Sequence, residues 1–280
     1  MHLIKQISEM RNYINRIEKE KSIGFVPTMG YLHQGHLSLI KRARQDCDRV
    51  VVSIFVNPIQ FGAGEDYRRY PRDLSRDIEL CKKESVDLVF APSRQEMFPN
   101  GYSTFVKVEG DLSSNLEGSS RPGHFQGVCT ILTKLFNIIR PDFSYFGEKD
   151  YQQALVVKRL VRDLNFNTRI VLLPTVREKD GLAVSSRNSY LSKEERCAAT
   201  VVCQSLEKAK QLIKEGKTDP ELVVSEMKDL IEAQPLVKID YVAVVDPETL
   251  RKVERIGKEV VIAVALKIGK TRLIDNMKIA

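Results

Sequence analysis

The hydrophobic positions along the first two-thirds of the chain follow two alternating spacings. Short β-branched apolar runs predict strands, and segments with apolar residues three and four apart predict helices. The predicted strands are Ile23–Val26, Val50–Val56, Leu88–Ala91, Thr104–Val108, Phe143–Phe146 and Arg169–Leu172. The predicted helices are His36–Asp46, Pro71–Glu84, Phe125–Ile139 and Tyr151–Leu164. This alternation indicates an α/β fold with a mainly parallel sheet that helices cover on both faces.

The pattern changes after Pro174. The polar residues from Thr175 to Tyr190 have no clear period and predict a long loop. Two helices and three strands are predicted after it, over Lys193–Glu215, Pro220–Ala233, Ile239–Val245, Val260–Ala265 and Thr271–Ile274. Helices followed by an antiparallel, hairpin-like region suggest a small α+β domain. We therefore predict two domains, residues 1–175 and 176–280.

Composition excludes several classes of protein. Hydrophobic residues make up 42% of the chain, and the net charge of +7 is dispersed, so nucleic-acid binding is not indicated. The five cysteines form no C-x-x-C pair, which predicts free thiols in the cytoplasm rather than disulfides or a zinc site. The segment from His2 to Lys21 predicts an amphipathic helix, not a signal peptide. No apolar run is long enough to span a membrane.

The segment P-T-M-G-Y-L-H-Q-G-H, residues Pro27–His36, lies where the first predicted strand turns into a helix. The N–H groups at a helix N-terminus favour an anion, most often a phosphate. Gly30 and Gly35 would let the backbone approach one, and His33 and His36 can donate hydrogen bonds to it. The alternative is a loop with two surface histidines. The strand before and the helix after favour a nucleotide site, because that mechanism requires this context.

Two further segments follow predicted strands. Gln60 lies on a turn where it could bind a small polar substrate, although alone it is better explained as a surface turn. In G-E-K-D-Y-Q-Q, Gly147 permits close approach, Lys149 can neutralise phosphate and Asp150 can hold Mg²⁺. Gln153 lies one helical turn after Asp150. The alternative here is an ordinary helix cap with an exposed lysine.

Two loops also carry polar side chains that suit a ligand. The residues V-S-S-R-N at Val184–Asn188 offer hydroxyls and a guanidinium to phosphate, in a loop that could close over a nucleotide. They could equally form an interdomain linker, with Ser192 capping the next helix. In the segment before the helix at Phe125, Arg121 and His124 could orient substrate or be ordinary capping and surface residues.

Together these segments closely resemble the pantothenate synthetase (pantoate–β-alanine ligase) family. The resemblance spans nearly the whole chain in the family's order, through P-T-M-G-Y-L-H-Q-G-H, F-V-N-P-I-Q-F-G, Y-P-R, L-E-G-S-S-R-P-G-H-F, F-G-E-K-D-Y-Q-Q, P-T-V-R-E-K-D-G-L-A-V-S-S-R-N and T-R-L-I-D-N. It implies a Rossmann-like nucleotidyltransferase domain, a smaller C-terminal lid domain and a homodimer. It also implies that pantoate and ATP, with Mg²⁺, form pantoyl adenylate, which β-alanine converts to pantothenate and AMP.

The resemblance also implies roles for particular residues. It places the ATP site at Met29, Gly30, Tyr31, Leu32, His33, Gln34, Gly35, His36, Gly147, Glu148, Lys149, Asp150, Val176, Val184, Ser185, Ser186 and Arg187. It makes His36 the catalytic residue, and His33, Lys149 and Arg187 are further donors to the phosphates. Gln60 and Gln153 would bind pantoate, Gln60 would also lie near β-alanine, and Asp77 matches an aspartate associated with the site. Asp150 stays the Mg²⁺ ligand predicted from the residues above.

The sequence departs from the family pattern at two positions. Val184 stands where methionine is common, and Tyr31 stands where a small residue is common, so the Tyr31 ring must turn away from ATP or narrow its pocket. Two other functions are alternatives: a nucleotidyltransferase acting on a phosphorylated acceptor, and a nucleotide- or RNA-binding module without catalysis. The interpretation as a ligase predicts only small-molecule substrates, with no nucleic acid or membrane partner.

Overall fold

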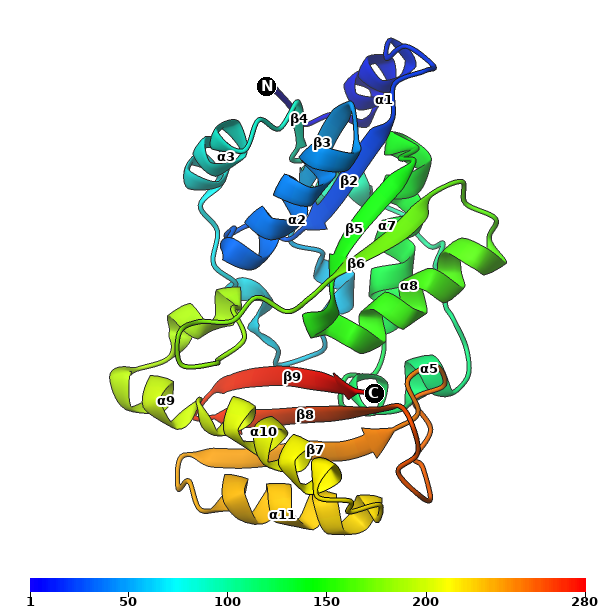
Figure 1. Cartoon of the computed structure of the whole chain (residues 1–280). Helices are drawn as coiled ribbons and strands as arrows, with labels where there is room; N and C mark the ends of the chain where they lie inside the picture. The colour runs from blue at the N-terminus through cyan, green and yellow to red at the C-terminus, as the bar shows by residue number, and fades with distance from the viewer. The chain divides into compact units, whose positions relative to one another are not determined.

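A computed structural model describes all 280 residues of the chain, which forms two compact units (Figure 1). The first unit comprises Met1–Glu109, Arg121–Glu148 and Gln153–Pro174. The second comprises Gly110–Ser120, Lys149–Gln152 and Thr175–Ala280. The second unit therefore includes two short segments from the first part of the chain. The predicted division into residues 1–175 and 176–280 stays a prediction.

The first unit is built on a parallel sheet of six strands. They are β1 (His2–Ile4), β2 (Ile23–Thr28), β3 (Arg49–Ile54), β4 (Leu88–Phe90), β5 (Phe143–Gly147) and β6 (Arg169–Leu173). Their spatial order is β1-β4-β3-β2-β5-β6, and all pairs are parallel. After β2, the chain adds β3 and β4 on one side and then β5 and β6 on the other. The boundary between β2 and β5 is therefore the topological switch point, where open α/β sheets bind ligands.

Helices cover both faces of this sheet because successive strand residues point to opposite sides. Val26 packs with Leu37 and Ile40, whereas the ring of its neighbour Phe25 meets Phe136 edge-on, with ring centroids 6.3 Å apart. Figure 1 shows the corresponding helices α2 and α7 on opposite faces. The helices of this part of the chain are α1 (Ile7–Asn15), α2 (Gln34–Asp46), α3 (Leu74–Lys83), α4 (Arg94–Met97), α7 (His124–Ile139) and α8 (Tyr151–Asp163), with the 3₁₀ turns η1 (Pro58–Gln60) and η2 (Asp66–Arg68).

The second unit holds an antiparallel sheet of three strands, in the order β7-β8-β9. Helices α10 and α11 bury their apolar sides against it, with Leu206, Met227 and Ile262 fully enclosed. Its elements are α5 (Asp111–Ser114), α6 (Glu117–Ser120), η4 (Ser186–Tyr190), α9 (Lys193–Ala198), α10 (Val201–Lys214), α11 (Pro220–Glu232), β7 (Val237–Val245), β8 (Val260–Ile268) and β9 (Thr271–Ile279). The predicted fold class, a Rossmann-like parallel α/β part with a smaller α+β part, is confirmed.

The predicted strand Thr104–Val108 is wrong. Residues 103–109 have no strand partner, although their sequence is rich in β-branched and aromatic residues. The backbone there bonds to a helix instead: the Val106 N–H donates to Thr130 Oγ1 (3.0 Å), and that hydroxyl donates back to the Val106 carbonyl (3.4 Å). A side chain of α7 thus replaces the expected neighbouring strand.

Two helix predictions also need correction. The N-terminal segment does not form one helix from His2 to Lys21, because its first residues form the edge strand β1 and the helix ends at Asn15. The predicted helix Lys193–Glu215 is divided into α9 and α10 near Thr200, whose hydroxyl donates to the Cys197 carbonyl (2.8 Å). Such side-chain bonds compete with helical ones and interrupt the helix.

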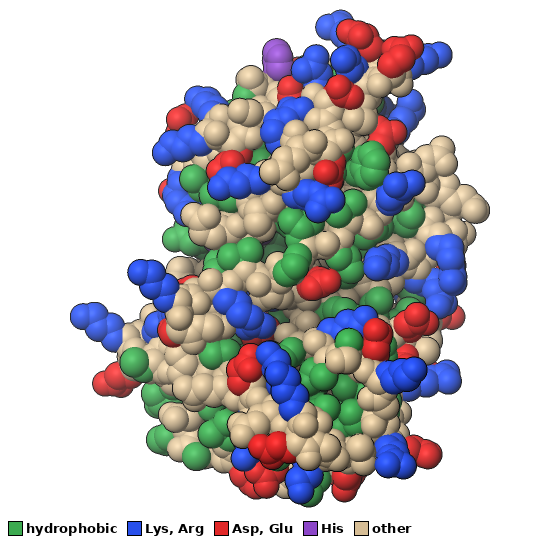
Figure 2. Space-filling view, in the orientation of Figure 1, with side chains coloured by type: hydrophobic (Ala, Val, Ile, Leu, Met, Phe, Trp, Pro, Cys, Tyr) green, Lys and Arg blue, Asp and Glu red, His purple; other side chains and the backbone are tan.

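Charged groups of both signs are interspersed on the face seen in Figure 2, which suits the dispersed net charge of +7. None of the helices has both the length and the apolar character needed to cross a bilayer.

Candidate nucleotide and substrate site

The sheet order brings the predicted residues of the first unit to one edge. Residues 29–36 follow β2, Gln60 follows β3, and Gly147 ends β5 before Gln153 in the first turn of α8. Strands β3, β2 and β5 are parallel neighbours, so their carboxyl ends lie at the same edge of the sheet. These segments flank the switch point, which is where the fold places a ligand.

The loop between β2 and α2 is fixed by Asp77, a residue of α3 that is 1% exposed. Its carboxylate accepts hydrogen bonds from the backbone N–H groups of Tyr31 and Leu32, both at 2.7 Å. Burial raises the pKa of Asp77, and these two donors oppose that rise. Gly30 has φ +82°, and a Cβ there would lie 3.0 Å from Asp77 Oδ2. Asp77 therefore shapes this loop.

The two histidines of the loop form a stacked pair at the start of α2. Their ring centroids are 4.0 Å apart and the ring planes differ by 29°. His33 occupies the N-cap, and its backbone N–H lies 3.3 Å from His36 Nδ1. A ring nitrogen that accepts a hydrogen bond carries no proton, so neutral His36 is protonated at Nε2. A helix N-terminus with imidazole donors beside it suits an anion.

The ring of Tyr31 lies against α3. The Arg76 guanidinium carbon is 5.0 Å from the ring centroid, a cation–π distance. This contact shows that the side chain of Tyr31 packs on Arg76 of α3.

Gln60 is 9% exposed and is held through both ends of its side-chain amide. Its Oε1 accepts from Asn57 Nδ2 (2.9 Å), and its Nε2 donates to the Met29 sulfur (3.2 Å). The second bond joins Gln60 directly to the loop that carries His33 and His36. Asn57 was not among the predicted site residues, although it lies three residues before Gln60 in N-P-I-Q.

The backbone of Gln60 is held by a chain of charged and polar groups. His124 Nδ1 lies 2.9 Å from the Gln60 carbonyl oxygen and donates to it, while His124 Nε2 lies 3.1 Å from Arg121 Nη1. Arg121 also donates twice to Glu65, both at 2.8 Å. Burial raises the pKa of Glu65, but the hydrogen bonds and charge of Arg121 outweigh it and lower the pKa overall. Arg121 and His124 were predicted either to orient substrate or to be capping and surface residues. In the structure they hold the backbone carbonyl of Gln60 in place.

The predicted ATP contacts at residues 176 and 184–187 belong to the second unit. The Val184 N–H donates to the Val176 carbonyl (2.9 Å), and Arg177 pairs with Ala183, so the expected loop contains a short hairpin. The 3₁₀ turn η4 begins directly after it, and Ser185 Oγ accepts from the Arg187 N–H (3.3 Å). Val176, Val184 and residues 185–187 are therefore neighbours in space.

Lys149 and Asp150 lie in the 3₁₀ turn η3 (Glu148–Asp150), where the chain passes from the first unit to the second. Lys149 Nζ is 3.5 Å from Asp150 Oδ1. Asp150 is half exposed, and no group of three or more His, Cys, Asp or Glu side chains is arranged to hold a metal ion.

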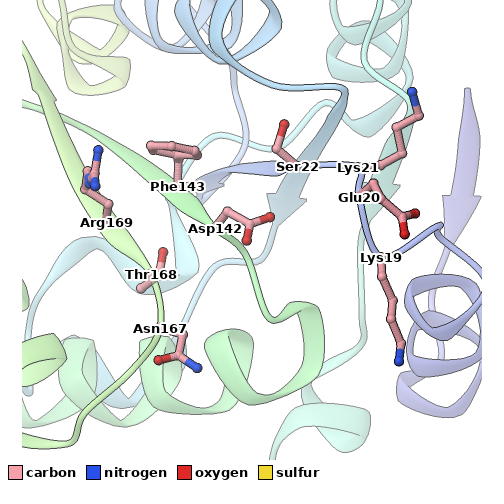
Figure 3. Close-up of a pocket in the computed structure, with 9 residues that line it drawn as sticks. All are labelled: Lys19, Glu20, Lys21, Ser22, Asp142, Phe143, Asn167, Thr168 and Arg169. Atoms are coloured by element: carbon pink, nitrogen blue, oxygen red, sulfur yellow. The ribbon is translucent and has the colours of Figure 1, made fainter.

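A hollow of about 610 Å³ lies at the opposite edge of the parallel sheet (Figure 3). It is lined by Lys19–Ser22, Asp142, Phe143 and Asn167–Arg169, which precede or begin β2, β5 and β6. Figure 3 shows Lys19 and Lys21 pointing in opposite directions, so these cations do not converge on one ligand. The amino ends of the strands are also the wrong edge for a ligand in this fold.

Comparison with known proteins identifies the family. The sequence model of the family described as pantoate-beta-alanine ligase matches residues 2–278. The chain belongs to the pantoate–β-alanine ligase family. A pantothenate synthetase of Thermosipho africanus is 54% identical over 278 residues, which are 99% of each chain.

Solved structures of this family agree. The crystal structure of pantothenate synthetase from Thermus thermophilus has a TM-score of 0.94 and 48% identity, and the match covers 99% of each chain. The pantoate-beta-alanine ligase of Francisella tularensis, complexed with beta-gamma ATP and beta-alanine, has a TM-score of 0.81 and 37% identity, covering 99% of this chain and 97% of that one.

Membership of the pantoate–β-alanine ligase family confirms the enzyme class expected from the sequence. Ligase activity, ATP binding and pantothenate biosynthesis follow from the family. A binding module without catalysis is accordingly set aside. The roles of individual site residues stay predictions.

Proposed function

We propose that this enzyme condenses (R)-pantoate with β-alanine through a pantoyl-adenylate intermediate, releasing AMP and pyrophosphate. The observation that carries the proposal is the bond between Gln60 and Met29, which joins the predicted pantoate residue to the histidine loop at the switch point. The Francisella tularensis relative, which holds beta-gamma ATP and beta-alanine, supports both small molecules as substrates here.

In the first step, a carboxylate oxygen of pantoate attacks the α-phosphorus of ATP, and the bond to the pyrophosphate oxygen breaks. Negative charge grows on the phosphate oxygens, and positioned donors stabilise it without a protein nucleophile. His36 Nε2–H, His33, Lys149 and Arg187 supply these donors in our proposal. The other proposed ATP contacts are residues 29–35, 147, 148, 150, 176 and 184–186.

In the second step, the β-alanine amine attacks the acyl carbon, the bond to AMP breaks, and the amine loses a proton. The acyl adenylate would hydrolyse in water, so the site must shield it until the amine arrives. Gln60 and Gln153 would hold the pantoyl group through both steps, because carboxamides can donate to the carboxylate and accept from hydroxyls.

The proposed reaction predicts AMP release only when ATP, pantoate and β-alanine are all present. Reversible adenylate formation also predicts pantoate-dependent exchange of labelled pyrophosphate into ATP in the absence of β-alanine. AMP release without exchange would argue against the adenylate, and activity with a phosphorylated acceptor instead of pantoate would favour another nucleotidyltransferase.

Replacing Gln60 with alanine should weaken pantoate binding by about tenfold to a hundredfold, because a hydrogen bond to a charged group contributes about 1.5–3 kcal/mol. Gln60 Nε2 donates to a thioether, a weak acceptor that a carboxylate would readily replace. Calorimetry should show ATP affinity changed less than about twofold. A loss confined to ATP would contradict the assignment.

We also propose that Mg²⁺ enters with ATP, since Mg²⁺ keeps several waters and takes one or two carboxylates besides the phosphates. We assign this role to Asp150, which is half exposed beside Lys149. Activity should therefore stop with EDTA and return with excess Mg²⁺.

We further propose that the enzyme is cytoplasmic and forms a homodimer. The five free cysteines suit a reducing cytoplasm, and sedimentation should show the mass of a dimer.

A further inference from the structure

Strand β9 begins with the T-R-L-I-D-N motif, to which the proposed reaction assigns no role. The last two residues of this motif are Asp275 and Asn276, and their side chains bond to two different segments that are proposed to bind ATP. Adjacent residues of a strand point to opposite faces of the sheet, so one short stretch can hold two segments. All of these contacts lie within the second unit.

Asn276 holds the turn that carries Lys149. Its Nδ2 donates to the Lys149 carbonyl oxygen at 2.8 Å. Two residues later, the Tyr151 hydroxyl donates to the Pro247 carbonyl (2.9 Å). Neither bond belongs to a strand ladder, so side-chain hydrogen bonds hold residues 149–151 against the rest of the second unit.

Asp275 holds the hairpin that precedes Ser185. Its side chain is 1% exposed and accepts from Arg177 Nη1 (2.6 Å) and Nη2 (3.1 Å). Arg177 Nη1 also donates to the Gly181 carbonyl (3.0 Å), which closes the hairpin beside Val176 and Val184. A part-buried, bidentate ion pair of this kind defines one geometry for the loop.

We propose that Asn276 is a positioning residue for Lys149. Asp275 connects strand β9 to the hairpin, and Asn276 connects the same strand to the turn of Lys149. Strand β9 therefore sets the position of the Lys149 ammonium group relative to residues 185–187. The proposal rests on the function assigned above, because it takes Lys149 as an ATP-binding group.

A double-mutant cycle on ATP affinity tests this. Calorimetry compares the wild type with Asn276→Ala, Lys149→Ala and the double variant. Asn276→Ala alone should weaken ATP binding about fivefold to tenfold, the size expected for one part-buried hydrogen bond. In the Lys149→Ala background the same change should cost less than about twofold, because no ammonium remains to be placed. Equal losses in both backgrounds would overturn the proposal.

Two controls separate positioning from general damage to the fold. Lys278 lies on β9 like Asn276, and its side chain forms an exposed ion pair with Glu259 (2.9 Å). Lys278→Ala removes this ion pair and should leave ATP affinity unchanged. Asn276→Ala should leave the KM for pantoate unchanged while kcat/KM for ATP falls, because Gln60 and Gln153 belong to the first unit. If Asn276→Ala unfolds, Asn276→Ser serves in the same cycle.

The two proposals fail in different ways. ATP binding with a coupled cycle but no pantoate-dependent AMP release would overturn the proposed reaction and support this inference. Full ligase activity with an additive cycle would overturn only the inference. A wild-type chain that binds no ATP would overturn both.

Discussion

Replacing His36 with alanine should slow adenylate formation by about 10²–10³-fold, the loss typical when one donor to a developing oxyanion is removed. The hydrogen bond from the His33 backbone N–H to Nδ1 leaves the proton of neutral His36 on Nε2. We propose that the Nε2–H group of His36 donates to the α-phosphate, where negative charge grows as the carboxylate attacks.

Alanine removes two functions of His36 together, so two conservative variants are needed to separate them. Asparagine places an oxygen near the Nδ1 position and keeps the acceptor at the start of α2, but it lacks a donor at the Nε2 position. Glutamine reaches that position with an N–H and gives up the near acceptor. We expect His36→Asn to be as stable as the wild type but as inactive as His36→Ala, and His36→Gln to recover part of the rate.

Pantoate-dependent pyrophosphate exchange measures this step without the second one, and urea unfolding measures stability. His2→Ala is the matched control, since it removes an imidazole whose ring meets that of Tyr13 at a tilt, with centroids 5.3 Å apart, in the N-terminal segment. Unchanged exchange in His36→Ala would refute the assignment. An active His36→Asn variant would show that His36 acts only by organising the helix start.

Local hydrophobic spacing predicted the central strands of the parallel sheet but missed β1, one of its two edge strands. Strands β2, β3 and β5 are buried on both faces, so they appear in the sequence as continuous apolar runs. The edge strand β1 has only three residues, all at least partly exposed, and lacks that signal. Thr104–Val108 has the composition of a strand, but pairing with Thr130 of α7 is a long-range contact that no local pattern reveals.

The candidate site shows the same division. The motifs after β2 and β5 could be predicted as ligand loops because strand, loop and helix are consecutive in the chain. The order β3-β2-β5, which places Gln60 beside Met29, depends on packing between segments far apart in sequence. The supports of the loops come from still further away: Asp77 reaches Tyr31 from α3, and Asn276 reaches Lys149 from β9. These supports are single polar side chains, which periodicity does not detect.

Replacing Gly127 with alanine should be among the most damaging changes in the first unit, although it adds one methyl group to a helix. Helix α7 crosses the turn η1 at this residue. A Cβ there would lie 2.4 Å from the Ile59 carbonyl oxygen and 2.5 Å from Gln60 Cα. Both are backbone atoms that cannot rotate away, so the helix and the turn must separate.

In an ordinary helix interior, replacing glycine with alanine stabilises the protein by about 0.5–1 kcal/mol. Here we expect the opposite sign, a loss of about 1–3 kcal/mol from overpacking. Separation would also strain the bond from Asn57 Nδ2 to the Gly127 carbonyl (3.0 Å), and Asn57 is the residue that holds the Gln60 amide. Pantoate affinity should therefore fall together with stability.

Gly62→Ala is the matched control for this change. It adds the same methyl group two residues from Gln60, where the nearest atom, Glu65 Oε1, is 3.7 Å away in ordinary contact. We expect this variant to keep both the urea midpoint and the pantoate affinity of the wild type. A raised midpoint in Gly127→Ala would mean that α7 and η1 can move apart freely. Because the close approach of these two elements sets the position of the Gln60 backbone, that outcome would also remove the structural basis for placing pantoate at Gln60.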